Sequence, residues 1–189
     1  MIVRDGFKVL IFETALLPLT FLNKLLLIPI VTAIILTIVF FRDPDRVIGE
    51  GVVSPADGKI DHVEGRRIEI FMSILDCHVN RSPVDGVIRR VVYRRGSKFP
   101  AFLRVENPER NEIQIENEHG TFKVVQIAGF LARRIVCFVK EGERVKRGEK
   151  IGMIIMGSRV VLEVPDGFVF VRKVGDRVKA GETIAIKSC

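Results

Sequence analysis

The sequence predicts a mainly β protein of the α+β class, in which an apolar helical segment precedes a β-rich domain. The excess of apolar residues lies almost entirely in the first 41 positions. After them, short runs alternate apolar and polar residues and are separated by glycines, as half-buried strands require. No helical period is visible in that part of the chain. We therefore divide the chain into a membrane-associating segment, residues 1–41, and a β-rich domain, residues 42–189.

The N-terminal segment contains two apolar runs. Leu25–Phe41 carries no charge, and as a helix it would be roughly 25 Å long, slightly less than the roughly 30 Å of a hydrocarbon core. The second run, Phe7–Leu22, is interrupted by Glu13 and Pro18. A helical hairpin and a single span beside an interfacial helix fit equally well, and a buried core helix is the alternative. We favour attachment at the cytoplasmic face of the cell membrane, either peripheral or monotopic.

The composition indicates an anionic partner. The chain has a net charge of +7, which suits nucleic acid, an acidic lipid surface or a phosphate-bearing substrate. The basic segment from Arg89 to Leu103 suits nucleic acid, with Tyr93 and Phe99 stacking on bases, or a membrane surface, with Phe99 and Phe102 touching acyl chains. The apolar N-terminal segment and the lack of an RNA-binding motif favour the membrane, and a solvated charged strand face is the structural alternative. The three cysteines lack metal-ligand spacing, which predicts a reduced compartment, no disulfide framework and no metal site.

An internal repeat lies in the β-rich domain. Residues 139–154, VKEGERVKRGEKIGMI, match residues 171–186, VRKVGDRVKAGETIAI. Each copy predicts two glycine turns followed by a strand. The pair resembles the barrel-sandwich hybrid of lipoyl and biotinyl carrier domains, in which the hairpin between the halves presents a lysine for acylation. Arg159 falls near that position here, and a guanidinium is a poor acylation target.

The same hairpin contains the dipeptide Gly157-Ser158. A serine hydroxyl can attack the preceding carbonyl and convert the amide into an ester, after which elimination and hydrolysis leave a pyruvoyl group. This chemistry needs a small preceding residue, a turn held by flanking strands and a base, for which His78 and Asp57 are the candidates. A pyruvoyl ketone forms a Schiff base with an amine and accepts electrons from a decarboxylating amino acid head group. An ordinary turn serine is the alternative.

Four motifs occur in a characteristic order: FFRDPDR, VVSPADGKI, MSILDCHVNRSPVDG and the segment Ala132–Pro165. From Phe40 to Pro165 the chain resembles the short bacterial and archaeal form of the phosphatidylserine decarboxylase proenzyme family. The resemblance implies self-cleavage between Gly157 and Ser158 into a β chain, 1–157, and an α chain, 158–189, which stay associated.

The resemblance also implies the cofactor, the substrate and the reaction. The cofactor would be a covalent pyruvoyl group made from Ser158. The substrate would be the anionic phospholipid phosphatidylserine, or archaetidylserine in an archaeal relative. The products would be phosphatidylethanolamine or archaetidylethanolamine and carbon dioxide.

Three further residues take roles from the resemblance. Asp57 matches an aspartate, and His78 the first histidine, that assist processing and decarboxylation in the family. The second histidine of long-form members is Arg81 here, a cation that can pair with a phosphate or carboxylate of the substrate. A turn aspartate and a sheet histidine are the structural alternatives. The competing function is a membrane-anchored adaptor or carrier module, similar to lipoyl and biotinyl domains, without catalysis.

Overall fold

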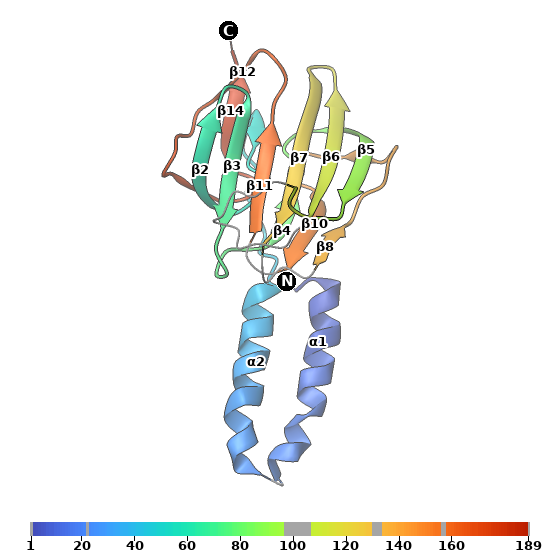
Figure 1. Ribbon diagram of the computed structural model, residues 1–189, viewed down its shortest axis with the longest axis vertical. Coiled ribbons are helices and arrows are strands. Elements are labelled where there is room, and N and C mark those ends of the chain that lie inside the picture. The colour runs from blue at the N-terminus through green and yellow to red at the C-terminus, as the bar shows by residue number, and fades with distance from the viewer. Residues whose placement is uncertain (1, 22, 97–106, 130–133, 156–157, 189) are drawn as a thin grey trace. The chain divides into compact units, whose positions relative to one another are not determined.

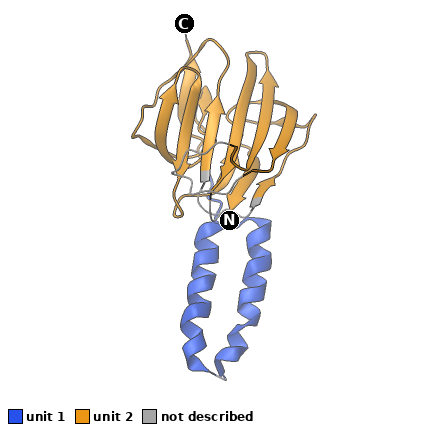
Figure 2. Cartoon of the chain, viewed as in Figure 1, with its two compact units in different colours: residues 1–45 blue, residues 46–189 orange. Residues whose placement is uncertain are grey.

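The computed structural model describes residues 2–21, 23–96, 107–129, 134–155 and 158–188. Contacts between Cα atoms divide the chain into two compact units, residues 1–45 and residues 46–189 (Figure 2). The aromatic part of the predicted basic segment, which includes Phe99 and Phe102, lies outside the described residues.

The first unit is helical. Its elements are α1 (Arg4–Ala15), η1 (Leu17–Phe21), η2 (Lys24–Leu26) and α2 (Leu27–Phe40). Asn23 lies between the two apolar runs. Its side-chain Oδ1 accepts a hydrogen bond from the backbone N–H of Leu25 at 3.0 Å and so caps η2. The two α-helices are joined by a hydrogen bond of 2.9 Å from the hydroxyl of Thr37 to the carboxylate of Glu13.

The predicted membrane span is not observed as a single long helix. The run from Leu25 to Phe41 divides between η2 and α2, and α2 has 14 residues, a length of about 21 Å. Among the helices that the structure describes, none combines the length and apolarity needed to cross a membrane. The coarser prediction of two N-terminal helical segments followed by a β-rich part is confirmed.

The second unit contains fourteen strands in the part of the chain that the structure describes. They are β1 (Val52–Val53), β2 (Gly58–Glu64), β3 (Arg67–Met72), β4 (Val79–Arg81), β5 (Gly86–Arg94), β6 (Arg110–Asn117), β7 (Gly120–Ala128), β8 (Arg134–Cys137), β9 (Arg144–Val145), β10 (Lys150–Ile155), β11 (Ser158–Glu163), β12 (Phe168–Phe170), β13 (Arg177–Val178) and β14 (Thr183–Lys187). An eight-stranded sheet has the order β13-β2-β3-β11-β7-β6-β5-β9, and two three-stranded sheets have the orders β4-β10-β8 and β1-β14-β12 (Figure 1).

The large sheet curls around the main hydrophobic core (Figure 1). Alternate residues of its central strands are fully buried, as the period of two along a half-buried strand requires. These inner-face residues are Ile68 and Ile70 of β3, Val160 and Leu162 of β11, Phe122 and Val124 of β7, and Ile113 and Ile115 of β6. Burial of this apolar surface is the main favourable term in the folding of the second unit.

The two copies of the internal repeat have matching local structures. The first glycine of each copy, Gly142 or Gly175, has a positive φ, and so does the second, Gly148 or Gly181. Between the glycines each copy forms a two-residue strand, β9 or β13, and after them a longer strand, β10 or β14. However, β9 and β13 form the two edges of the large sheet, while β10 and β14 lie in separate small sheets. The described sheets therefore form a curled half-barrel and do not show the expected barrel-sandwich hybrid.

Candidate active site

The chain changes sheets at the predicted cleavage site. Strand β10 ends at Ile155 in the β4-β10-β8 sheet, and β11 begins at Ser158 in the centre of the large sheet. Met156 and Gly157 lie outside the described residues. Both flanks of Gly157-Ser158 are strands, as the sequence predicts. Each flank is hydrogen-bonded into a different sheet.

Polar residues gather at the end of the large sheet where β11 begins. The backbone of Ser158 lies opposite Met72 of β3 and Ala128 of β7. The next row of the inner face, two residues further along each strand, contains buried Gln126 and Asn111 beside apolar Val160 and Ile70. The row after that is entirely apolar in these central strands. The inner face of these strands is therefore apolar along most of its length and contains two buried amides near this end.

His78 lies beside the strand that leads to the predicted cleavage site. It immediately precedes β4 and is fully buried. Its backbone carbonyl accepts a hydrogen bond of 3.2 Å from the N–H of Ile154 in β10, three residues before Gly157. The pairing of β4 with β10, which places Val79 opposite Met153, fixes this position. The structure thus places His78, the predicted base, next to the strand that leads to the predicted cleavage site.

Asp57 is held at a buried turn at the start of β2. One carboxylate oxygen accepts a hydrogen bond of 2.6 Å from Arg46, and the other accepts one of 2.8 Å from the backbone N–H of Ala180. The next residue, Gly58, has a φ of +153°, and a Cβ there would lie 2.2 Å from the carbonyl oxygen of Phe71. Glycine is thus required for β2 to approach β3 so closely. Asp57 therefore occupies the predicted turn, and its side chain fastens that turn to two other segments.

Arg46 connects Asp57 electrostatically to the segment that contains His78. Burial lowers the pKa of the Arg46 guanidinium, but the charge of Asp57 and the hydrogen bonds to Asp57 and Cys77 outweigh this effect, so the pKa is raised. Burial raises the pKa of the Cys77 thiol, which therefore remains protonated at neutral pH and is not an activated nucleophile. The sequence pattern predicts no role for Arg46, although this residue belongs to the FFRDPDR motif.

Arg81 is buried near a turn of the first repeat copy. Its Nη1 donates a hydrogen bond of 2.9 Å to the carbonyl oxygen of Gly148, and its backbone N–H donates to the carbonyl of Pro55. Arg81 lies on β4, opposite Lys150 of β10. One hydrogen bond of its guanidinium therefore stabilises the turn between β9 and β10.

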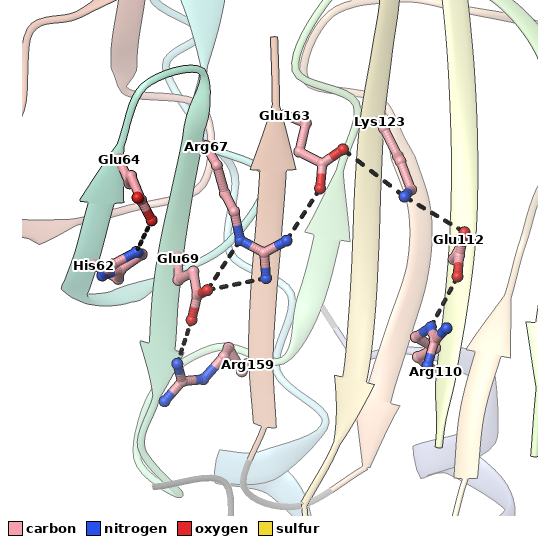
Figure 3. Close-up of polar contacts among 9 residues, drawn as sticks. All are labelled: His62, Glu64, Arg67, Glu69, Arg110, Glu112, Lys123, Arg159 and Glu163. Atoms are coloured by element: carbon pink, nitrogen blue, oxygen red, sulfur yellow. Dashed lines mark hydrogen bonds and ion pairs between the residues drawn. The ribbon is translucent and has the colours of Figure 1, made fainter. Parts of the chain in front are cut away.

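Arg159 is enclosed by carboxylates on the outer face of the large sheet. Its Nη2 lies 2.6 Å from Asp61, and its Nη1 donates to Glu69. Arg67 forms ion pairs with both Glu69 and Glu163 (Figure 3). The exposed fraction of Arg159 is 6%. A residue held in this way is not presented on a mobile tip, as an acylated carrier residue would be.

We expect Arg159→Ala to destabilise the second unit by about 3 kcal/mol, because it removes one of the two cations that contact buried Glu69 and the cation that pairs with Asp61. Urea unfolding would measure this loss. The matched control is Arg66→Ala, which removes an exposed ion pair to Asp166 and should change the free energy of unfolding by less than about 1 kcal/mol. Equal effects of the two substitutions would contradict this interpretation of the ion-pair network.

The effect of Arg159→Ala should also depend on pH. Burial raises the pKa of Glu69, but hydrogen bonds from Arg159 and Arg67 and their charges outweigh burial, so the pKa is lowered from 4.5. A carboxylate whose pKa is lower in the folded state than in the unfolded state contributes its full stabilisation at pH values above the unfolded-state pKa. This contribution is lost as the pH falls through the folded-state pKa. The difference in unfolding free energy between wild type and Arg159→Ala should therefore be largest near neutral pH and shrink in acid.

Comparison with known proteins identifies the family of the chain. The family model described as phosphatidylserine decarboxylase matches residues 34–186. The chain belongs to the phosphatidylserine decarboxylase family. It is accordingly a decarboxylase proenzyme of phospholipid biosynthesis, a carboxy-lyase that depends on a pyruvoyl group formed by self-cleavage.

The relatives within this family include enzymes named for two lipids. The chain is 54% identical to a putative archaetidylserine decarboxylase proenzyme of Archaeoglobus fulgidus, over 99% of this chain and 96% of the relative. It is 39% identical to a protein of the same description from Methanocaldococcus jannaschii, over 86% and 94% of the two chains. It is 44% identical to a phosphatidylserine decarboxylase proenzyme of Beijerinckia indica, over 77% and 71%.

Proposed function

We propose that the chain cleaves itself between Gly157 and Ser158 and then decarboxylates the serine head group of archaetidylserine or phosphatidylserine, releasing the corresponding ethanolamine lipid. Family membership supports the reaction class. The position of the cleavage site is supported by one observation: β10 and β11, which flank this dipeptide, belong to two different sheets, and buried His78 contacts β10. The high identity to the Archaeoglobus relative over the whole chain favours the ether-linked substrate.

The proposed cleavage forms an ester and then breaks it. The hydroxyl oxygen of Ser158 adds to the carbonyl carbon of Gly157, and the amide nitrogen leaves as an amine after taking up a proton. Removal of the Cα proton of Ser158 then expels Gly157 as a carboxylate, and hydrolysis of the resulting dehydroalanine releases ammonia. Both steps need a proton acceptor, for which we propose His78, while Asp57 and Arg46 hold the surrounding segment in place.

The residues at this corner suit a pyruvoyl group at the start of β11. That group supplies a ketone that takes up the substrate amine and draws electrons from the departing carboxylate. The polar inner-face row of Gln126 and Asn111 and the buried imidazole of His78 provide polar partners in a site otherwise enclosed by hydrophobic core. We propose that the buried positive charge of Arg81 attracts the phosphate or carboxylate of the lipid head group.

The cleaved chains would stay together because the α chain supplies internal strands. Strand β11 pairs along its whole length with β3 and β7, and β14 pairs with β1. Residues 158–189 therefore share sheets and core with residues 46–157. Separation of the two products would expose most of this core to water, which is strongly unfavourable.

A lipid substrate makes contact with a membrane surface necessary. The helical unit exposes large apolar side chains on both α-helices, including Phe7, Ile11 and Phe12 of α1 and Ile28 and Ile35 of α2. We propose that this unit holds the enzyme at the cytoplasmic surface of the cell membrane as a peripheral or monotopic protein.

Intact-mass measurement of the purified chain tests the proposed function. We expect two polypeptides, residues 1–157 and an α chain that begins at position 158 with a pyruvoyl group and is therefore blocked to N-terminal sequencing. Vesicles that contain archaetidylserine or phosphatidylserine should release carbon dioxide with this protein, and the ratio of the two rates identifies the preferred lipid. A single uncut chain, the form expected of an adaptor or carrier, would contradict the proposal.

A further inference from the structure

Three buried amide side chains form a continuous hydrogen-bonded chain inside the second unit. The side-chain nitrogen of Asn111 donates to the oxygen of Gln126 at 2.9 Å, and the nitrogen of Gln126 donates to the oxygen of Asn80 at 2.8 Å. The nitrogen of Asn80 in turn donates to the sulfur of Met72 at 3.8 Å. The exposed fractions of the three amide residues are 0% or 1%. We call Asn111, Gln126 and Asn80 the amide relay.

The relay ends at the strand row where the α chain would begin. Met72, which accepts the last hydrogen bond, is paired with Ser158 across β3 and β11. Asn80 lies on β4, two residues after His78. The last amide of the relay is therefore close in the fold both to the first residue of β11 and to the proposed base.

The relay also links the two sheets that flank the cleavage site. Asn111 and Gln126 belong to β6 and β7 of the large sheet, whereas Asn80 belongs to the sheet that contains β10. Gln126 packs so closely on Gly152 of β10 that a Cβ there would lie 2.7 Å from its side-chain nitrogen. The orientation of Asn80 is thus determined by residues of the large sheet.

The hydrogen bonds give the relay a direction. A side-chain amide has a donor at one end and an acceptor at the other, and a thioether sulfur can only accept. The N–H of Asn80 therefore points toward Met72. In the same way, the N–H of Asn111 points toward Gln126 and that of Gln126 toward Asn80. Because a thioether is a weak acceptor, a negatively charged oxygen would be a much stronger partner for this donor.

We propose that the amide relay presents the N–H of Asn80 as the donor that stabilises negative charge on the scissile carbonyl during self-cleavage. As the Ser158 oxygen adds to the Gly157 carbonyl carbon, the π-electron pair moves to the carbonyl oxygen, and this charge disappears when the amide nitrogen departs with a proton. Buried donors fixed in advance are effective for such charges. Gln126 and Asn111 are positioning residues, and the inference rests on the proposed cleavage at Gly157-Ser158.

Two substitutions that leave the reacting dipeptide unchanged test the direction of the relay. In Asn111→Asp the new carboxylate can only accept, so Gln126 turns its nitrogen toward it and its oxygen toward Asn80, which withdraws the Asn80 N–H from the Ser158 row. Gln126→Met keeps a similar shape without charge and releases Asn80 from its restraint. We expect each to slow self-cleavage by roughly tenfold or more, measured as the fraction of cut chain against time, well below the unfolding temperature.

The matched control is Val124→Ala, which removes buried apolar volume from the same strand, β7, without touching the relay. It should lower the unfolding temperature and leave the cleavage rate unchanged. Hydroxylamine, which cuts esters, should not restore cleavage in the relay variants, because the relay acts before the ester forms. Normal cleavage in both relay variants, equal slowing in Val124→Ala, or rescue by hydroxylamine would each overturn the inference.

The outcomes for wild type separate this inference from the proposed function. A wild-type chain that is never cut contradicts the proposed function itself. A wild-type chain that is cut before Ser158, together with relay variants that are cut at the same rate, contradicts only the role of the amide relay.

Discussion

Ser158→Ala should yield one uncut chain with no decarboxylase activity. Without the hydroxyl, no ester can form with the Gly157 carbonyl, so neither the new chain end nor the pyruvoyl group can arise. Intact mass and release of carbon dioxide from serine-lipid vesicles measure the two losses. Because the pyruvoyl ketone carries the chemistry of decarboxylation, the expected effect is complete loss of activity.

Two companion variants make the Ser158→Ala result specific. Ser158→Cys keeps a nucleophile at the same position, so hydroxylamine should cut it through a thioester while leaving Ser158→Ala intact. Ser73→Ala removes a hydroxyl from the residue after β3, where the backbone N–H, rather than the side chain, binds Asp76, and should be processed normally. Cleavage of Ser158→Ala at the wild-type position would show that another group attacks the bond.

His78→Gln should reduce self-cleavage, decarboxylation or both by roughly 10²–10⁴-fold, the usual contribution of a general acid or base. Glutamine approximates the size of the buried imidazole but cannot accept and release a proton near neutral pH. The two effects are separated by following cleavage first and then measuring turnover on the fraction that has been cut. A loss in turnover alone would assign His78 to decarboxylation and leave processing to another base.

The control for His78→Gln is His62→Gln. His62 lies on β2 and pairs with the exposed carboxylate of Glu64 at 3.2 Å. Its replacement should alter neither cleavage nor turnover. If His78→Gln retains both activities at wild-type rates while its unfolding temperature confirms a folded protein, our assignment of the base is wrong.

Much of the architecture could be predicted from local patterns. Alternation of apolar and polar residues marks β6 and β7, and paired glycines mark the turns of both repeat copies. The apolar N-terminal runs mark the helices, although parts of both runs form the short helices η1 and η2, which leaves the α-helices shorter than hydropathy suggests. These features depend on residues within a few positions of one another, which is why the sequence was sufficient. The motifs around Ser158, Asp57 and His78 are local in the same way, and their order along the chain is enough to indicate the family.

By itself, then, the sequence determined the class of fold, the family and the dipeptide at which the chain is proposed to cut. Only the tertiary structure decided which distant residues meet there. It joined Arg159 to Glu69 across 90 positions and Asn80 to Gln126 across 46. It also replaced the expected carrier-like barrel with a curled half-barrel sheet. The physical reason is that these contacts depend on strand order and register, which are set by burial of the whole core and not by any local segment.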